Sequence, residues 1–191
     1  LTGDSGYAGV PMTVHHNTVA FDGKGQGSEG NGHDAFSEMP YELLNGIRIR
    51  EVKLGNKSVS IIADLASAYK PELGVDSFTR QFLFTAPGNF LIEDSIKTSK
   101  SEKVTSYLHS DNSIIKRDGG FQFETGKPFL FAEILEPKLF DAVIEPNIVT
   151  APGPPGNVDK GEREVRGVRL AISPKKAETK INFKFRLRIR K

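Results

Sequence analysis

The clearest pattern of hydrophobic and polar positions lies near the C-terminal end of the chain. Between positions 181 and 190 every second residue is apolar, and the residues between them are polar or basic. The apolar positions are Ile181, Phe183, Phe185, Leu187 and Ile189. Side chains of a β-strand alternate between its two faces, so this pattern predicts a strand with one buried and one solvent-facing side.

Shorter patterns of the same kind recur from Gly46 onward, separated by turn sequences such as Pro87-Gly88-Asn89. They predict further strands over 47–54, 59–65, 78–85, 89–96, 103–109, 114–117, 121–124, 129–135, 142–144 and 165–172. In the first of them the alternation slips by one residue at Arg50-Glu51, which is typical of a β-bulge.

These strands predict the fold class. About ten short strands with regular turns indicate an all-β, antiparallel two-sheet β-sandwich, jelly-roll-like, with a closed barrel as the alternative. No segment has a helical period of useful length, and Leu43 with Leu44 is expected to form at most a turn. We expect one domain over 1–191, with a Gly-rich loop region over 1–46 and the sandwich strands over 47–191.

Composition excludes several classes of protein. The 191 residues include no Cys, which excludes disulfides, thiolate nucleophiles and Cys metal sites. No apolar run approaches the roughly 20 residues of a membrane helix, so no membrane partner is expected. A Gly-x-Ser-x-Gly elbow and a phosphate-binding loop that opens a helix are both missing from the sequence. The chain therefore contains no complete enzyme active site that its sequence reveals.

Charge is distributed unevenly along the chain. Residues 160–191 contain 12 Lys or Arg and 3 Asp or Glu, although the net charge of the whole chain is +2. This segregation suggests an acidic partner near the C-terminal segment, and a solvated strand face is the alternative. The basic residues alternate with core-facing ones and no aromatic residue lies among them on the polar face, so we expect no nucleic-acid partner.

Candidate metal ligands cluster near the N-terminus. Three of the four histidines, His15, His16 and His33, lie in the first 33 residues, which also contain Asp4 and Asp22. Imidazole nitrogens and carboxylate oxygens are suitable ligands for Zn²⁺, although the spacing matches no standard local motif. Polar surface residues are the alternative interpretation.

The residues around His16 also resemble a known family. The string Thr13-Val-His-His-Asn-Thr-Val-Ala-Phe-Asp-Gly-Lys-Gly-Gln26 resembles the His-Asn-Thr-Val-x-x-Asp-Gly-x-x-Gln signature of heparinase II/III-like polysaccharide lyases. Gly3-Asp4-Ser5-Gly6-Tyr7 resembles the Asp-x-Gly-Tyr stretch of some alginate and oligoalginate lyases of this group. The resemblance extends over most of the chain.

The resemblance implies a role within a larger protein. In this family an α-helical toroid precedes the β-sandwich, and the enzyme cleaves uronic-acid-containing polysaccharides by β-elimination. The toroid supplies the catalytic Tyr, and a His-x-His segment early in the sandwich supplies a further catalytic His and one metal ligand. Leu1 is not an initiator Met, and the toroid and the His-x-His segment are missing from this chain. We therefore expect a fragment that is inactive alone, with no catalytic residue of its own.

The resemblance also assigns individual residues. It implies His16 and Asp4 as ligands of a structural zinc ion in the intact parent, with a third ligand outside this chain and no zinc expected in the chain alone. It places His15, Asn17, Gln26 and His33 at the substrate. For His15 the alternative is a solvent-facing polar residue, whereas Asn17 and Gln26 alternatively shape the turn after the first strand. His33 alternatively closes the Gly-rich loop.

Two functions follow as hypotheses. The first is the C-terminal β-sandwich of a periplasmic or secreted polysaccharide lyase that binds an acidic polysaccharide, with alginate favoured over glycosaminoglycans by the Asp4-Ser5-Gly6-Tyr7 resemblance. The second is a carbohydrate-binding or adhesion module without chemistry. An upstream helical toroid would support the first, and upstream repeats or anchors would support the second.

Overall fold

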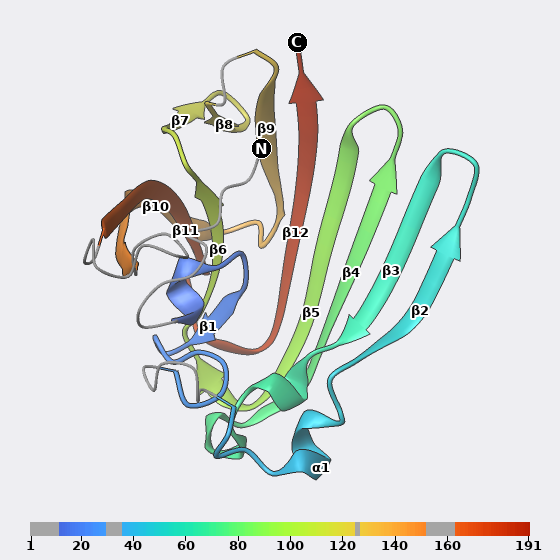
Figure 1. The fold of residues 1–191 in the computed structure, drawn as a ribbon, viewed down its shortest axis with the longest axis vertical. Coiled ribbons are helices and arrows are strands. Elements are labelled where there is room, and N and C mark those ends of the chain that lie inside the picture. The colour runs from blue at the N-terminus through green and yellow to red at the C-terminus, as the bar shows by residue number, and fades with distance from the viewer. Residues whose placement is uncertain (1–11, 30–35, 125–126, 152–162) are drawn as a thin grey trace.

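The computed structural model describes residues 12–29, 36–124, 127–151 and 163–191. They form two antiparallel β-sheets (Figure 1). The four-stranded sheet, here called the small sheet, has the order β1 (Val19–Phe21), β6 (Val104–Ser110), β11 (Arg163–Pro174) and β10 (Phe140–Ala151). The eight-stranded sheet, the large sheet, has the order β2 (Arg48–Leu54), β3 (Ser58–Asp64), β4 (Val75–Thr85), β5 (Asn89–Glu102), β12 (Glu178–Arg190), β9 (Phe129–Glu136), β8 (Gly120–Phe123) and β7 (Ile114–Arg117).

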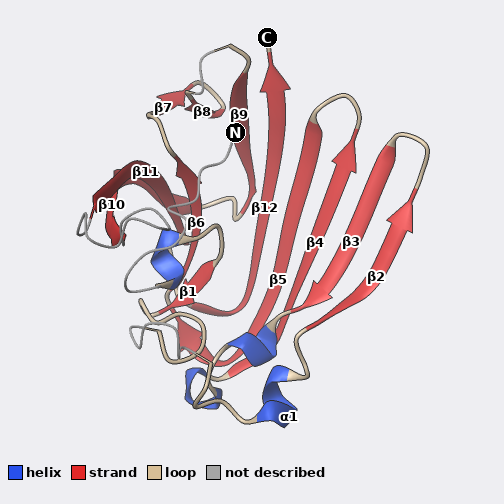
Figure 2. Cartoon of the chain, viewed as in Figure 1, coloured by secondary structure: helices blue, strands red, loops and turns tan. Residues whose placement is uncertain are grey.

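Helical structure in the described part of the chain consists of single turns (Figure 2). They are η1 (Thr13–His15), α1 (Tyr41–Leu44), η3 (Ala66–Ala68) and η4 (Pro71–Leu73). None of the described helices has the length and apolar character that crossing a membrane requires. The predicted all-β, two-sheet sandwich is therefore confirmed.

The core lies between the two sheets and is centred on β12. Its inward-facing residues Ile181, Phe183, Phe185 and Leu187 are all buried, whereas its outward-facing residues alternate with them as predicted. Leu170 and Ile172 of β11 provide the facing layer from the small sheet. The alternation of apolar and polar residues in β12 thus indicates which of its side chains point into the core.

The predicted bulge is confirmed, and a turn with positive φ angles follows β1. The pairing of β2 with β3 shifts between Ile49 and Glu51, so Arg50 is the extra residue of a bulge. Asp22 and Gly23 both have positive φ angles, 48° and 77°, and connect β1 to the bridging residue Lys24. Asp-Gly is suited to such a turn because Asp tolerates, and Gly freely adopts, the left-handed region.

Strand β10 is much longer than its sequence pattern indicates. It spans Phe140–Ala151, whereas apolar residues predicted only 142–144. The extension carries polar residues such as Glu145 and Asn147, and Pro146 removes a backbone donor. β10 is an edge strand of the small sheet, so one row of its backbone groups has no neighbouring strand to pair with. Pro146 and polar side chains are therefore tolerated in it.

The large sheet is wider than the small one, and strands β2–β5 stand away from it (Figure 1). Ile49, Val52 and Leu54 of β2 are 65%, 53% and 77% exposed. Their registers through β3 and β4 place them on the same face as the core residues of β12. An apolar cavity of about 230 Å³ opens where the two sheets diverge, between Phe82 of β4 and Leu108 of β6. The uncovered part of this face is here called the β2–β5 wing.

Candidate functional site

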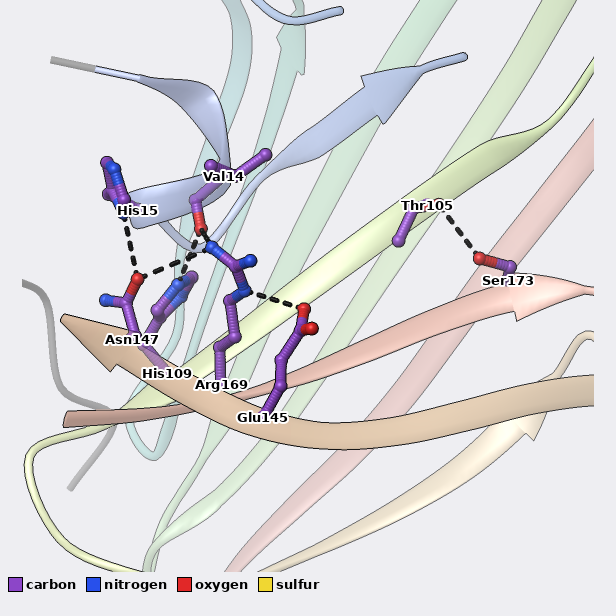
Figure 3. A network of polar contacts seen from close by, with 8 residues as sticks. All are labelled: Val14, His15, Thr105, His109, Glu145, Asn147, Arg169 and Ser173. Atoms are coloured by element: carbon purple, nitrogen blue, oxygen red, sulfur yellow. Dashed lines mark hydrogen bonds and ion pairs between the residues drawn. The ribbon is translucent and has the colours of Figure 1, made fainter. Parts of the chain in front are cut away.

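The segment that carries the resemblance lies over the small sheet. The carbonyl oxygen of Val14 accepts hydrogen bonds from His109 Nε2 at 3.0 Å and from Arg169 Nη1 at 3.2 Å (Figure 3). His109 of β6 and Arg169 of β11 are direct cross-strand partners. Their side chains therefore leave the same face of the sheet side by side and hold the chain across it.

Asn17 is bound from both sheets. Its side-chain oxygen accepts a hydrogen bond from the backbone N–H of His109 at 2.8 Å. Its carbonyl oxygen accepts one from Arg80 Nη1 of the large sheet at 2.9 Å. Arg80 also binds both carboxylate oxygens of the fully buried Asp94, at 2.6 and 2.7 Å. A bidentate pair of this kind fixes the guanidinium plane, so the position of Asn17 follows from it.

The start of β1 is held in the same way. The hydroxyl of Tyr69 donates to the carbonyl oxygen of Val19 at 2.7 Å, and the N–H of Tyr107 donates to that of Thr18 at 2.9 Å. Burial raises the pKa of Tyr69 to about 12. The hydroxyl therefore keeps its proton, and with it the hydrogen bond, well above neutral pH.

His15 contacts the outer face of the small sheet through its ring. Nδ1 lies 2.8 Å from Asn147 Oδ1, and that oxygen also lies 3.5 Å from Arg169 Nη1. Since an amide oxygen only accepts, Nδ1 is the donor in this contact. The contact with Asn147 orients the ring of half-buried His15 and leaves Nε2 as its second hydrogen-bonding atom.

Arg169 organises the rest of this face. Its Nε donates to Glu145 Oε1 at 2.7 Å, and its guanidinium carbon lies 5.6 Å from the centre of the Tyr107 ring. Burial raises the pKa of Tyr107, and the charge of Arg169 partly opposes that shift. The guanidinium of Arg169 is therefore already paired with Glu145 and Tyr107, so we regard Arg169 as a residue that positions its neighbours. The His15 network, as named here, comprises His15, His109, Glu145, Asn147 and Arg169.

A groove of about 590 Å³ begins beside this network and follows the outer face of the small sheet. Tyr107 and Glu145 line one part of it, and Lys103 and Lys175 line another. The hydroxyls of Thr105 and Ser173, which also line it, lie 2.8 Å apart (Figure 3). Hydroxyl, carboxylate and ammonium groups along one groove can bind a polyhydroxylated, charged ligand.

The residues predicted to contact substrate do not all lie in one place. His15 lies in the network, whereas Asn17 serves as the anchor of its segment. The backbone N–H of Gln26 donates to Thr13 Oγ1 at 2.7 Å, and its amide lies 3.4 Å from Thr18 Oγ1, so Gln26 shapes the loop. His33 lies outside the described residues.

The zinc prediction concerns His16 and Asp4. His16 is half-buried and directly follows η1, whereas Asp4 lies outside the described residues. Within the described ranges, no group of three or more His, Asp or Glu side chains is arranged to hold a metal ion. The described donors alone do not fit zinc, and ligation by His16 with Asp4 stays a prediction.

Sequence reasoning missed Arg80 and Asp94, although a signal was present. Both occupy inward positions in otherwise apolar alternations: Arg80 lies between Phe78 and Phe82, and Asp94 between Ile92 and Ile96. A charge at a core position requires a partner, and two such charges on neighbouring strands indicate a buried pair. No comparable pattern marks Glu145, Asn147 or Arg169, which lie on a mixed polar face.

Comparison with known proteins gives matches in structure alone. No family model matches the sequence, and no curated protein sequence does. Heparinase III, the BT4657 gene product with methylated lysines, matches with a TM-score of 0.66 and 14% identity over 93% of this chain. Heparan sulfate lyase HepC from Pedobacter heparinus matches with a TM-score of 0.65 and 13% identity over 94%.

The chain spans only part of the proteins it matches. It covers 24% of the heparinase III chain and 24% of the HepC chain, and a further structure of heparinase III matches with a TM-score of 0.58 over the same share. At these identities the likeness concerns fold, and it agrees with the resemblance of the sequence. The chain therefore has the fold of a segment that makes up about a quarter of these heparinase III and heparan sulfate lyase chains.

Proposed function

We propose that the chain is the β-sandwich domain of a polysaccharide lyase, which cleaves a uronic-acid-containing polysaccharide by β-elimination. The observation that carries the proposal is the fold match over 93% of the chain to a part of heparinase III. The His-Asn-Thr segment supports it, because Asn17 of that segment is bound from both sheets. In this proposal the domain forms one wall of the substrate cleft.

β-Elimination divides the work among several groups. A base removes the C5 proton of the uronic acid, a neutralising group masks its carboxylate, and an acid assists the departing glycosidic oxygen. The described residues offer His15 Nε2 as a hydrogen-bonding partner for a sugar hydroxyl. Arg169 and Asn147 hold that ring in place. We assign His15 a substrate-binding role and place the base and acid in the remainder of the longer enzyme.

The substrate is defined here by its uronic acid. The resemblance at Asp4-Ser5-Gly6-Tyr7 favours alginate, whereas the matched structures are named as heparinase III and heparan sulfate lyase. Both polymers carry uronic acid, so the shared chemistry is a carboxylate beside the carbon that loses its proton. Alginate and heparan sulfate are therefore both used in the test.

The test is elimination by a longer polypeptide that carries this domain. Cleavage produces an unsaturated uronate, which absorbs in the ultraviolet. We expect activity on at least one of the two polymers, a loss of about tenfold in kcat/KM for His15→Ala, and little change for the exposed control Asn112→Ala. The 191-residue chain alone should release no unsaturated product.

Two results would contradict this assignment. Absence of elimination by the longer polypeptide, combined with binding of the polymers, would favour the non-catalytic carbohydrate-binding module. Turnover by the 191-residue chain at the rate of a complete lyase would show that no other domain is required.

A structural zinc ion bound by His16, with Asp4 as second ligand, belongs to the same proposal for the longer protein. Imidazole and carboxylate are a normal ligand pair for zinc. Metal analysis of that protein should find zinc that is lost in His16→Ala, together with lower thermal stability. Zinc retained at full stoichiometry in His16→Ala would exclude ligation by this residue.

A further inference from the structure

Two groups of basic residues stand out in the structure, and the C-terminal segment contributes to both. The group on the outer face of β12 already has partners. Lys184 pairs with Glu93 at 2.8 Å, and Arg186 and Arg188 both bind Glu133, at 3.1 and 2.9 Å. These residues form the solvated strand face that was the alternative interpretation of the sequence, and they need no acidic partner from outside.

The second group gathers at one end of the sandwich, where several connections meet. It consists of five exposed lysines from three connections and the start of β12: Lys103, Lys138, Lys175, Lys176 and Lys180. In contrast to Lys184 further along β12, these five have no ion-pair partner among the residues that the structure describes. Their positive charge is therefore available to a ligand. They are here called the lysine end.

The lysine end surrounds a groove of about 730 Å³. Lys138, Lys175, Lys176 and Lys180 line this groove, together with the two carboxylates Glu136 and Glu178, so the charged groups of its wall sum to a positive value. Pro174 and Lys175 also line the groove of about 590 Å³ that follows the outer face of the small sheet. The two grooves thus adjoin at Pro174 and Lys175.

The combined path leads toward the His15 network. Phe140, at the lysine end of β10, pairs with Pro174, whereas Asn147, further along the same strand, contacts His15. Phe140 and Asn147 are seven positions apart in extended strand, a distance on the order of 20 Å. A path of this length suits a linear chain better than a compact small molecule.

We propose that this path binds a linear anionic polysaccharide, with the carboxylates or sulfates of the chain at the lysine end and its sugar hydroxyls along the outer face of the small sheet. The choice of a polysaccharide rests on the proposed function, whereas the location rests on the lysines and the grooves. Thr105, Ser173 and Asp141 line the second groove and offer the donors and acceptors that sugar hydroxyls require.

Nucleic acid is the competing polyanion, and the grooves lack what it requires. Tyr107 is the aromatic residue that lines the second groove, and it is only 8% exposed. Single-stranded nucleic acid is held largely by stacking of bases on exposed aromatic rings. The lining instead combines ammonium, hydroxyl and carboxylate groups, which favours a sugar polymer.

The test measures binding by the 191-residue chain, so that it requires no catalysis. The variant replaces three lysines of the lysine end, as Lys138→Gln/Lys175→Gln/Lys176→Gln. The control removes the same charge elsewhere, as Lys53→Gln/Lys57→Gln/Lys116→Gln, at three exposed positions of the large sheet and its turns. Calorimetric titrations use an alginate hexasaccharide, a heparan sulfate hexasaccharide, a neutral dextran of equal length and a single-stranded DNA of equal charge.

We expect at least one anionic hexasaccharide to bind, with affinity about tenfold weaker in the lysine-end variant and within twofold of the wild type in the control. Binding should weaken as salt is raised, and dextran should not bind. All six positions are exposed, so both variants should melt within a few degrees of the wild type.

Three outcomes would overturn the proposal. They are an equal loss of affinity in both variants, no binding of either anionic hexasaccharide, or binding of the DNA more tightly than of both. The fate of the proposed function is separate, because that function is measured as elimination by the longer polypeptide. Selective loss of binding in the lysine-end variant supports the anionic path even where no elimination occurs.

Discussion

Arg80 and Asp94 face each other on β4 and β5 among residues whose side chains form the core. Two short hydrogen bonds from Arg80 give each carboxylate oxygen of Asp94 a partner. Nη1 of Arg80 donates to the carbonyl oxygen of Asn17. A buried carboxylate is costly unless it is paired. The pair therefore couples the integrity of the core to the position of the segment that carries His15 and His16.

Removal of the cation should be strongly destabilising. Arg80→Met leaves the buried Asp94 without its partner, and we expect a loss of about 3 kcal/mol in the free energy of unfolding, measured by urea denaturation. Arg166→Met is the control, because Arg166 pairs with Glu164 at the surface, where both side chains are more than half exposed. The control should lose less than about 0.5 kcal/mol. Equal losses in the two variants would contradict this account of the buried pair.

Tyr69 should make stability depend on pH in the alkaline range. Its pKa is raised by burial from 10.0 to about 12, so between these values the unfolded chain loses a proton that the folded chain retains. The contribution of Tyr69 to the free energy of unfolding is therefore complete below pH 10. It decreases by about 1.4 kcal/mol per pH unit as the pH rises toward 12.

Urea denaturation at several pH values tests this. Tyr69→Phe should cost about 1 to 2 kcal/mol at neutral pH, because the carbonyl oxygen of Val19 loses its donor. The variant should also lose part of the alkaline decline. Tyr41→Phe, at a 75% exposed position, should show neither effect. An unchanged alkaline slope in Tyr69→Phe would disprove the assignment to Tyr69.

At the scale of elements, the segment between η1 and β1 has little regular structure of its own and is positioned by its neighbours. His109 and Arg169 bind the carbonyl oxygen of Val14 at its η1 end, Arg80 binds that of Asn17, and the N–H of Tyr107 binds that of Thr18. A chain segment held through its backbone in this way keeps its position regardless of its own strand propensity. It is the rigid element of the candidate site.

Asn17→Ala tests whether that residue anchors or binds. Loss of the amide oxygen removes the acceptor of the His109 N–H, so we expect a loss of about 1 to 2 kcal/mol in stability and faster hydrogen exchange at the His109 amide. Asn112→Ala, at an exposed turn position, is the control. Unchanged stability and exchange, together with weaker saccharide binding, would instead return Asn17 to the substrate-contacting role that the resemblance implies.

Individual strands were predictable from sequence to different degrees. The alternation in β12 could be predicted, because burial of one face imposes a period of two. The bulge in β2 could be predicted because its apolar residues keep the same period on either side of Arg50, although that face is uncovered. The full length of β10 could not, because its extension combines polar residues with Pro146 on an edge strand and leaves no apolar period. The His15 network combines residues from η1, β6, β10 and β11, and no local pattern records that those elements meet.

At the scale of the whole molecule, the two sheets differ in width, and the β2–β5 wing leaves apolar side chains exposed. Val52 and Leu54 lie on its outermost strand, where charged neighbours such as Lys53 and the bulge at Arg50 limit pairing with other strands. Contiguous exposed apolar surface of this kind binds hydrophobic dyes. Ile49, Val52 and Leu54 of the wing therefore offer a place where such a dye can bind.

Polar substitution on the wing should reduce dye binding without loss of stability. Val52→Thr/Leu54→Gln should lower the fluorescence of bound anilinonaphthalene sulfonate by about half, with a change in unfolding free energy within about 0.5 kcal/mol. Val143→Thr/Leu139→Gln is the matched control, since Val143 and Leu139 are similarly exposed, at 55% and 70%, but lie away from the wing. A larger decrease in the control than in the wing variant would contradict this interpretation.

The place of β12 has a consequence for the order in which the molecule assembles during synthesis. β12 joins β5 to β9, so it connects the β2–β5 half of the large sheet to the β7–β9 half, yet the other seven strands of that sheet all precede it along the polypeptide. A ribosome must therefore deliver all those strands before the sheet can become continuous. Until Glu178–Arg190 emerges, β5 and β9 present unpaired edges and the core lacks its central layer of phenylalanines. The nascent domain consequently exposes aggregation-prone strand edges until β12 is translated.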